Sequence, residues 1–185
     1  MQIYYELISL CWLAFFATWA VSVMVFRSTG RRYYSPLARG ARLLLLVAIM
    51  IGLRFAGRAP LQSFRSFGVA AAAAGVALCV VGLAFAVWAR ITLGRNWGMP
   101  MTRHEDPELV TSGPYRYVRH PIYTGLIAMF VGTTLVFPLA ALPCALTIAY
   151  SVFSAVREER DMAGRFPEAY PEYRKHSKMF VPFLL

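Results

Sequence analysis

The segment from Leu109 to Gly125 carries the side chains of this sequence that are best suited to binding a charged or aromatic ligand. It holds two arginines, one histidine, two prolines and three tyrosines, Tyr115, Tyr117 and Tyr123. Arg119 and His120 offer hydrogen-bond donors to a carboxylate. The tyrosine rings offer faces to a planar ring or to a cation. This concentration of ring and charge-bearing groups beside apolar sequence predicts a ligand-binding segment.

A pair of carboxylates, Glu158 and Glu159, follows at the end of a long apolar stretch. Carboxylates so close to a membrane span are costly unless they are hydrated, paired or bound to a cation. Either they pair with the neighbouring arginines, or Glu158 accepts a hydrogen bond from the ammonium group of a ligand. The His120-Pro121 dipeptide also has a plain alternative, because proline suits the first turn of a helix.

Together, the tyrosine-rich segment and the glutamate pair fit a ligand with an amino-acid head group, a positive charge and a purine ring. The arginine and histidine would bind its carboxylate, Glu158 its ammonium group, and the tyrosine rings its purine or its cation. S-adenosylmethionine is such a ligand. The glycine-rich fingerprint of a soluble Rossmann-type methyltransferase is absent from the sequence.

The elements that must position these side chains are membrane helices. The 185 residues are 58% hydrophobic and only 15% charged, against about 25% charged residues in a typical soluble domain. The net charge of +10 comes from arginines clustered between apolar spans. This is the pattern of cytoplasmic loops rather than of a nucleic-acid surface. Three isolated cysteines in apolar runs predict small buried side chains and no metal site.

The hydrophobic pattern predicts an all-α integral membrane protein with about five transmembrane helices. The basic loop after the first span places the N-terminus outside and the C-terminus in the cytoplasm. Spans 4 and 5 form a helical hairpin broken by Pro138 and Pro143, and the small-residue run 70–75 places span 3 centrally. The first span is expected to be uncleaved. The predicted spans are Tyr4–Phe26, Leu43–Ala56, Phe67–Ile91, Tyr123–Phe137 and Leu139–Val156.

After the hairpin, Phe166, Tyr170 and Tyr173 recur at helical spacing with basic residues beside them. Such a segment is expected to lie on the membrane surface with its rings towards the lipid. An alanine- and arginine-rich chain of this kind fits a bacterial inner membrane.

The run Gly113–Gly125, followed after the hairpin by Glu158-Glu159, resembles the signature of the isoprenylcysteine carboxyl methyltransferase family, whose relatives include phospholipid N-methyltransferases. The resemblance covers residues 93–173 and divides the chain into N-terminal spans, 1–92, and a methyltransferase core, 93–185. It implies that S-adenosylmethionine is the cofactor and S-adenosylhomocysteine the product. The cofactor-binding residues that it implies are Pro107, Glu108, Leu109, Val110, Tyr115, Arg119, His120, Pro121, Ile122, Tyr123, Glu158 and Glu159.

The chain departs from the family pattern at Ser154, where animal members place a substrate-contacting arginine. Arg157 is the candidate replacement, although it points in a different direction on the helix. The family's Phe-Gly is Phe166-Pro167 here. We interpret this second departure as a variation at the start of a helix, whereas the serine at position 154 leaves the acceptor open.

The predicted function is therefore methyl transfer from S-adenosylmethionine to a lipophilic or small acceptor at the cytoplasmic membrane face. Such a transfer depends mainly on alignment of donor and acceptor, so no residue is assigned as an acid or base. Two alternatives remain. One is an NADPH-dependent membrane reductase of the sterol-reductase type, and the other is a small transporter or scaffold without enzymatic activity.

Overall fold

The computed structural model describes residues 1–25, 67–96 and 108–181. Within these ranges the chain is helical, and its one bridge of β type is an isolated parallel contact between Val118 and Lys178. The prediction of an all-α protein is confirmed in these parts of the chain. The helices are α1 (Gln2–Val25), α3 (Val69–Leu93), α4 (Pro121–Val136), α5 (Ala141–Arg165) and α6 (Ala169–His176), joined by the 3-10 turns η2 (Gly94–Asn96), η3 (Gly113–Arg116) and η4 (Pro138–Ala140).

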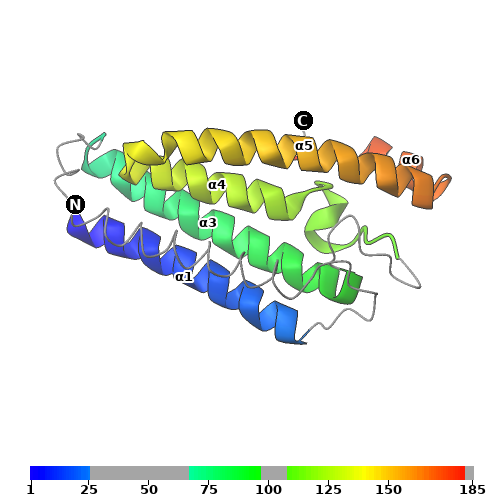
Figure 1. Cartoon of the computed structure of the whole chain (residues 1–185), viewed down its shortest axis with the longest axis horizontal. Helices are drawn as coiled ribbons and strands as arrows, with labels where there is room; N and C mark the ends of the chain where they lie inside the picture. The colour runs from blue at the N-terminus through cyan, green and yellow to red at the C-terminus, as the bar shows by residue number, and fades with distance from the viewer. Residues whose placement is uncertain (26–66, 97–107, 182–185) are drawn as a thin grey trace, which may run out of the picture.

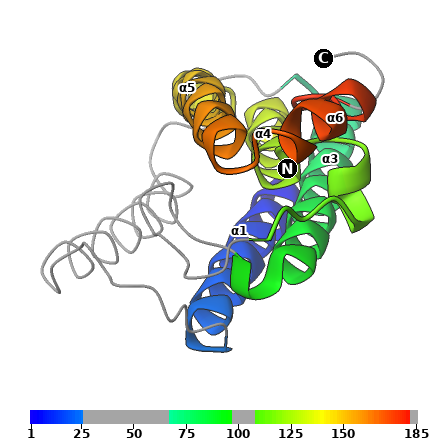
Figure 2. The ribbon, with the colours of Figure 1, turned by 90° about the vertical axis from the view of Figure 1, so that its right-hand side faces the viewer.

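The four long helices lie side by side along the long axis of the molecule (Figure 1). α4 runs back along α3, and α5 runs back along α4, so that the end of α5 lies near the start of α4 (Figure 1). The short helix α6 and the turn η3 lie at this same end (Figure 2). The hairpin thus brings two segments that are distant in sequence to one end of the bundle.

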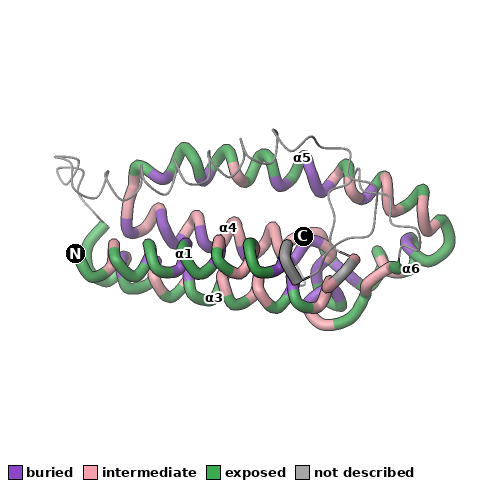
Figure 3. The backbone as a smooth tube through the Cα atoms, turned by 60° about the horizontal axis from the view of Figure 1, so that its bottom comes forward, coloured by how far each residue is buried: buried purple, intermediate pink, exposed green. Residues whose placement is uncertain are grey.

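Three of the described helices are long and apolar enough to cross a membrane, namely the segments Gln2–Ser22, Val69–Leu93 and Pro138–Arg165. α4 is apolar but shorter. Most side chains of α1 and α5 are exposed, whereas buried positions gather on the inner faces of the helices and around the turn η3 (Figure 3). Apolar side chains exposed to this extent suit a lipid environment. The predicted span Leu43–Ala56 lies outside the described residues.

Glycines set the contact between α3 and α4. A Cβ atom on Gly132 would lie 2.4 Å from the carbonyl oxygen of Gly75. At the second contact, a Cβ atom on Gly82 would lie 2.6 Å from the carbonyl oxygen of Gly125. The two helices therefore touch backbone to backbone, as small residues permit in lipid. The prediction of a central third span is confirmed, because α3 contacts α1, α4 and η3.

An aromatic cluster packs α1 onto this helix pair. Trp12 is 6% exposed, stacks with Phe16 and meets Phe130 of α4 edge to face. Its Nε1 donates a buried hydrogen bond of 3.0 Å to Oγ1 of Thr133. A buried indole N–H needs such a partner, and here the bond fixes α1 relative to α4. All three cysteines are free and buried, as predicted.

The break between α4 and α5 lies at one of the two predicted prolines. α4 ends at Val136, and Pro138 begins the turn η4. The predicted break at Pro143 is wrong, because this residue lies in the first turn of α5, where a missing N–H costs no helical hydrogen bond. α5 also continues beyond Val156 to Arg165. Glu158 and Glu159 in this extension find partners in neighbouring elements, which the apolar pattern alone does not indicate.

Candidate functional site

The turn η3 begins the site, and Gly113 makes this turn possible. Its φ of 58° lies in the left-handed region, which glycine adopts without strain. A Cβ atom there would also lie 2.9 Å from Oγ1 of Thr92 at the end of α3. Tyr115 is only 7% exposed behind this turn. Its burial, together with Tyr173 beside it, raises the pKa of its hydroxyl, so that Tyr115 is a neutral hydrogen-bonding group.

Arg119 joins the site to α5 through a buried ion pair. Its Nε lies 2.7 Å from Oε1 of Glu159, and the two side chains are 8% and 9% exposed. The guanidinium group also donates to the carbonyl oxygen of Ser177. A more distant cation, Arg174 of α6, lies 3.9 Å from the other carboxylate oxygen of Glu159. The guanidinium group of Arg119 is therefore bound to α5 and also to the segment that follows α6.

His120 lies between the two glutamates. Its Nδ1 is 3.5 Å from Oε2 of Glu158, and its Nε2 is 3.5 Å from Oε1 of Glu159. Burial alone would lower the pKa of the imidazole, but its interactions with the two carboxylates outweigh burial and raise this pKa above the ordinary value. Nε2 is buried and forms no hydrogen bond with any described residue. The ring thus keeps a buried polar atom that a ligand could engage.

Tyr123, in the first turn of α4, connects the carboxylate of Glu158 to the hydroxyl of Ser154. The tyrosine hydroxyl donates to Oε1 of Glu158 at 2.5 Å and lies 2.9 Å from Oγ of Ser154. Ser154 Oγ also donates to Glu158 Oε1, at 3.2 Å. The side chain of Glu158 remains 25% exposed, so its carboxylate is both held by hydroxyl groups and accessible.

The tyrosines of α6 pack against the protein, not against lipid as expected. Tyr170 is 4% exposed, and burial raises the pKa of its hydroxyl to about 12. The hydroxyl of Tyr173 donates to the carbonyl oxygen of Tyr115 at 2.7 Å. The expectation that this segment lies with its rings towards the membrane is therefore wrong. A partner for these rings exists within the chain, which helical spacing could not indicate.

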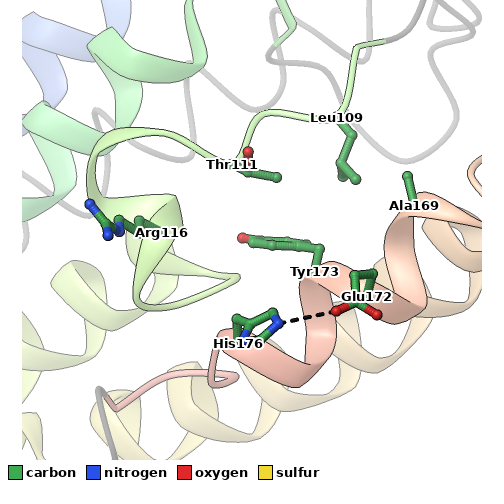
Figure 4. A pocket seen from close by; sticks show the side chains of 7 residues that line it. All are labelled: Leu109, Thr111, Arg116, Ala169, Glu172, Tyr173 and His176. Carbon is green, nitrogen blue, oxygen red and sulfur yellow. Dashed lines mark hydrogen bonds and ion pairs between the residues drawn. The ribbon is translucent and has the colours of Figure 1, made fainter.

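Two clefts lie beside this network. The larger cleft, of about 540 Å³, opens between the start of the segment Leu109–Gly125 and α6. It is lined by Leu109, Thr111, Arg116, Ala169, Glu172, Tyr173 and His176 (Figure 4). The smaller, of about 270 Å³, is lined by Thr92, Asn96, Glu108, Leu109, Val110, Thr111 and Ser112. His120, Tyr123 and Glu158 line neither cleft. Leu109 contributes to both.

The structure divides the predicted site residues into groups. Arg119, His120, Tyr123, Glu158 and Glu159 come together in one network of contacts. Glu108, Leu109 and Val110 line the clefts, and Tyr115 connects to α6. Pro121 is buried and Ile122 half-buried at the start of α4, whereas Pro107 lies outside the described residues.

Arg157 does not join the network. Its side chain is exposed, and its guanidinium carbon lies 5.5 Å from the ring centroid of Phe153, on its own helix. Among the residues that the structure describes, no group of three or more His, Cys, Asp or Glu could hold a metal ion.

Sequence reasoning missed the segment after α6. The backbone of Lys178 and Met179 bonds to Arg119 and His120, and Ser177 and Phe180 contribute carbonyl oxygens to Arg119 and Thr124. These contacts use main-chain atoms, so residue type gives no signal for them. The alternative pairing of the glutamates with their own neighbours does not occur for Glu159, whose short ion pair is with Arg119.

Apolar helices with an ionic network at one end define an integral membrane protein. Its fold is similar to that of the eukaryotic intramembrane Ras methyltransferase, isoprenylcysteine carboxyl methyltransferase. The TM-score is 0.57 at 23% identity, and the match covers 88% of this chain and 60% of that one. The chain belongs to the phospholipid methyltransferase family, whose model matches residues 70–169. The resemblance to the isoprenylcysteine methyltransferases is confirmed.

Curated relatives carry more than one name. The protein-S-isoprenylcysteine O-methyltransferase B of Arabidopsis thaliana is 32% identical over 60% of this chain and 58% of its own length. Methanethiol S-methyltransferase 1 of Bradyrhizobium diazoefficiens is 32% identical over 42% and 27%. The cobalt-zinc-cadmium resistance protein CzcN of Cupriavidus metallidurans is 32% identical over 50% and 44%. The chain thus spans about half the length, or less, of these relatives. The names of these relatives do not favour the alternative of an NADPH-dependent membrane reductase.

Proposed function

We propose that this protein transfers a methyl group from S-adenosylmethionine to a lipophilic or small acceptor at the cytoplasmic face of a bacterial inner membrane. The observation that carries the proposal is the convergence of Arg119, His120 and Tyr123 on the glutamate pair of α5. Methyltransferases among the relatives support the reaction class. Five spans, with the N-terminus outside and 93–185 as the methyltransferase core, complete the proposal.

The residues present fit the cofactor. Glu158 offers an accessible carboxylate to an ammonium group, and Nε2 of His120 is a buried polar atom without a hydrogen bond to any described residue. Its nearest polar atom is Oε1 of Glu159 at 3.5 Å, longer than an ordinary hydrogen bond. Buried polar groups normally form such a bond, so a ligand atom is a reasonable partner for it. The aromatic face of Tyr173 and the side chain of Leu109 border the larger cleft (Figure 4). Such a surface suits a planar ring.

When bound, S-adenosylmethionine supplies a methyl group that is already activated on a sulfonium centre. The protein then has to bind and orient the reactants rather than form a covalent intermediate. Glu158 and His120 would hold the amino-acid end, with Tyr123 and Ser154 fixing the glutamate side chain. Arg119 would act through Glu159, to which it is already paired.

The acceptor is proposed only as a class. The serine at position 154 is hydrogen-bonded to Tyr123 and Glu158, and Arg157 faces Phe153. Neither observation favours a cation held ready for an acceptor carboxylate. These two positions therefore do not restrict the acceptor to a carboxylate, and a thiol, reacting as its thiolate, or an amine is as suitable a class as a prenylcysteine.

Isothermal titration of the purified protein with S-adenosylhomocysteine tests the proposal. Saturable binding is expected for the unmutated protein, with at least about tenfold weaker binding for Glu158→Gln, since a lost charge-assisted hydrogen bond costs about 1.5–3 kcal/mol. His120→Ala should weaken binding as well. Arg160→Gln, an exposed position on the same helix, serves as the control and should bind normally. Absence of binding to the unmutated protein would overturn the proposal.

A further inference from the structure

The segment that follows α6 runs beside the segment Leu109–Gly125 that carries Arg119 and His120. We call residues 177–181 the C-terminal strap. Its Lys178 forms the parallel bridge with Val118, and α6 places it next to the start of α4 (Figure 2). Ser177, at its beginning, is only 2% exposed. The strap is therefore part of the packed end of the bundle, although it contains no helix.

Main-chain hydrogen bonds attach the strap to the residues before α4. The N–H of Arg119 donates to the carbonyl oxygen of Lys178 at 2.7 Å, and the N–H of His120 donates to that of Met179 at 3.1 Å. In the other direction, the N–H of Lys178 donates to the carbonyl oxygen of Tyr117 at 3.0 Å. Three bonds within a few residues fix the backbone on which both side chains are mounted.

Side chains extend this attachment on both sides of His120. The guanidinium group of Arg119 donates to the carbonyl oxygen of Ser177. Thr124, one turn into α4, donates through Oγ1 to the carbonyl oxygen of Phe180 at 2.7 Å. The ring of Phe180 lies 5.9 Å from that of His120, centroid to centroid. The strap thus contacts residues before, at and after His120.

We infer that the C-terminal strap positions His120 and Arg119 against the glutamate pair of α5 and so determines the affinity of the cofactor site. The inference rests on the proposed function. The strap residues are positioning residues, because they act through Arg119 and His120. The backbone before α4 is not helical at His120, where φ is −124° and ψ is 57°. α4 holds this residue only at its carbonyl oxygen, which accepts from the N–H of Thr124 at 3.0 Å, whereas the strap holds its N–H.

The pKa of His120 shows whether the strap positions this side chain or only supports the fold. The charged or titratable groups around its ring are Glu158 and Glu159 of α5, Arg119 in the motif, Tyr123 of α4 and, through Glu159, Arg174 of α6. Contact with both carboxylates raises the pKa of the imidazole. A ring released from them should titrate nearer the ordinary value of about 6.5.

Substitution of Lys178 provides a matched pair of variants. Lys178→Pro removes the N–H that bonds to Tyr117, whereas Lys178→Ala keeps that N–H and removes only an exposed side chain. Ser177 is extended, with φ −125° and ψ 150°, a conformation that a following proline permits. The proline also fixes φ at position 178 near about −65°, so Thr124→Val provides a second, independent test of the strap.

The experiment measures S-adenosylhomocysteine affinity by titration and the pKa of His120 by NMR of protein labelled at its three histidines. For Lys178→Pro we expect about three- to tenfold weaker binding and a lower pKa of His120, with Lys178→Ala unchanged in both. Thr124→Val removes the 2.7 Å bond to Phe180 together with the longer bond, 3.1 Å, to the carbonyl oxygen of His120. It should shift both quantities in the same direction, whereas Thr134→Val, which removes only a bond within α4, should leave both unchanged.

The outcomes separate the inference from the proposed function. If the unmutated protein binds the ligand while Lys178→Pro and Thr124→Val leave affinity and the His120 pKa unchanged, the inference is overturned and the proposed function stands. If the unmutated protein does not bind the ligand, the proposed function fails. The inference about the affinity of the cofactor site then fails as well. If Lys178→Pro does not fold, Thr124→Val decides.

Discussion

Removal of one member of the Arg119–Glu159 ion pair should destabilise the protein more than removal of both. The pair is at least 90% buried, with Nε and Oε1 2.7 Å apart. Loss of one partner leaves a buried charge uncompensated, which costs about 3–5 kcal/mol. For Arg119→Met we expect the lower end of this range, because Glu159 keeps His120 at 3.5 Å and Arg174 at 3.9 Å. Glu159→Met leaves Arg119 with the carbonyl oxygen of Ser177 and should cost at least as much.

The double variant removes both charges and replaces them with side chains of similar volume. It should be at least as stable as either single variant, which corresponds to a coupling energy of at least about 3 kcal/mol. Unfolding in detergent micelles, followed by tryptophan fluorescence, measures the four proteins of the cycle. The Asp161–Arg165 pair on the same helix, more exposed at 37% and 21%, is the control and should show coupling below about 1 kcal/mol. Additive losses in the Arg119–Glu159 cycle would refute the assignment of a buried, mutually dependent pair.

Two further predictions concern packing and pH. Gly132→Ala should destabilise the bundle by about 1–3 kcal/mol, because its Cβ would lie 2.4 Å from the backbone oxygen of Gly75. Gly164→Ala, with open space around its Cβ, should be neutral or slightly stabilising; equal melting temperatures for the two variants would contradict the contact. Since the pKa of His120 is raised in the folded state, its contribution to stability is fully present below the unfolded pKa of about 6.5 and is lost as pH rises through the folded pKa. The melting temperature should therefore fall more between about pH 6 and 9 in the unmutated protein than in His120→Asn, and parallel curves would exclude this contribution.

The helices could be predicted because apolar composition and breaker residues determine them. Pro138 marks the end of one helix, and the predicted bounds of the first and third spans lie within about two residues of the observed ones, as is usual at helix ends. Pro143 misled the prediction, since a proline in a first helical turn and a proline at a break look alike in sequence. The length of α5 was underestimated because polar composition after Val156 does not show that Glu159 has a partner in Arg119.

The sequence predicts which residues belong to the site but not which of them contact one another. His120, Tyr123 and Glu158 stand out because polar side chains are rare beside membrane spans. The bond between the Tyr123 hydroxyl and Glu158 and the partner of Arg119 depend on how α4 and α5 pack, which side-chain type does not specify. The strap was invisible for a different reason, since it acts through peptide groups that every residue carries.

The glycine contacts between α3 and α4 also determine where a membrane-dissolved molecule can reach the network. Where Gly75 meets Gly132 and Gly82 meets Gly125, one backbone lies directly on the other, and the thickness of an acyl or prenyl chain does not fit between them. The contacts recur two helical turns apart, so this seam is closed along the middle of both helices. A hydrophobic acceptor dissolved in the bilayer must therefore approach from another side of α4. Engineering of acceptor preference should accordingly target the faces of α4 and α5 rather than this seam.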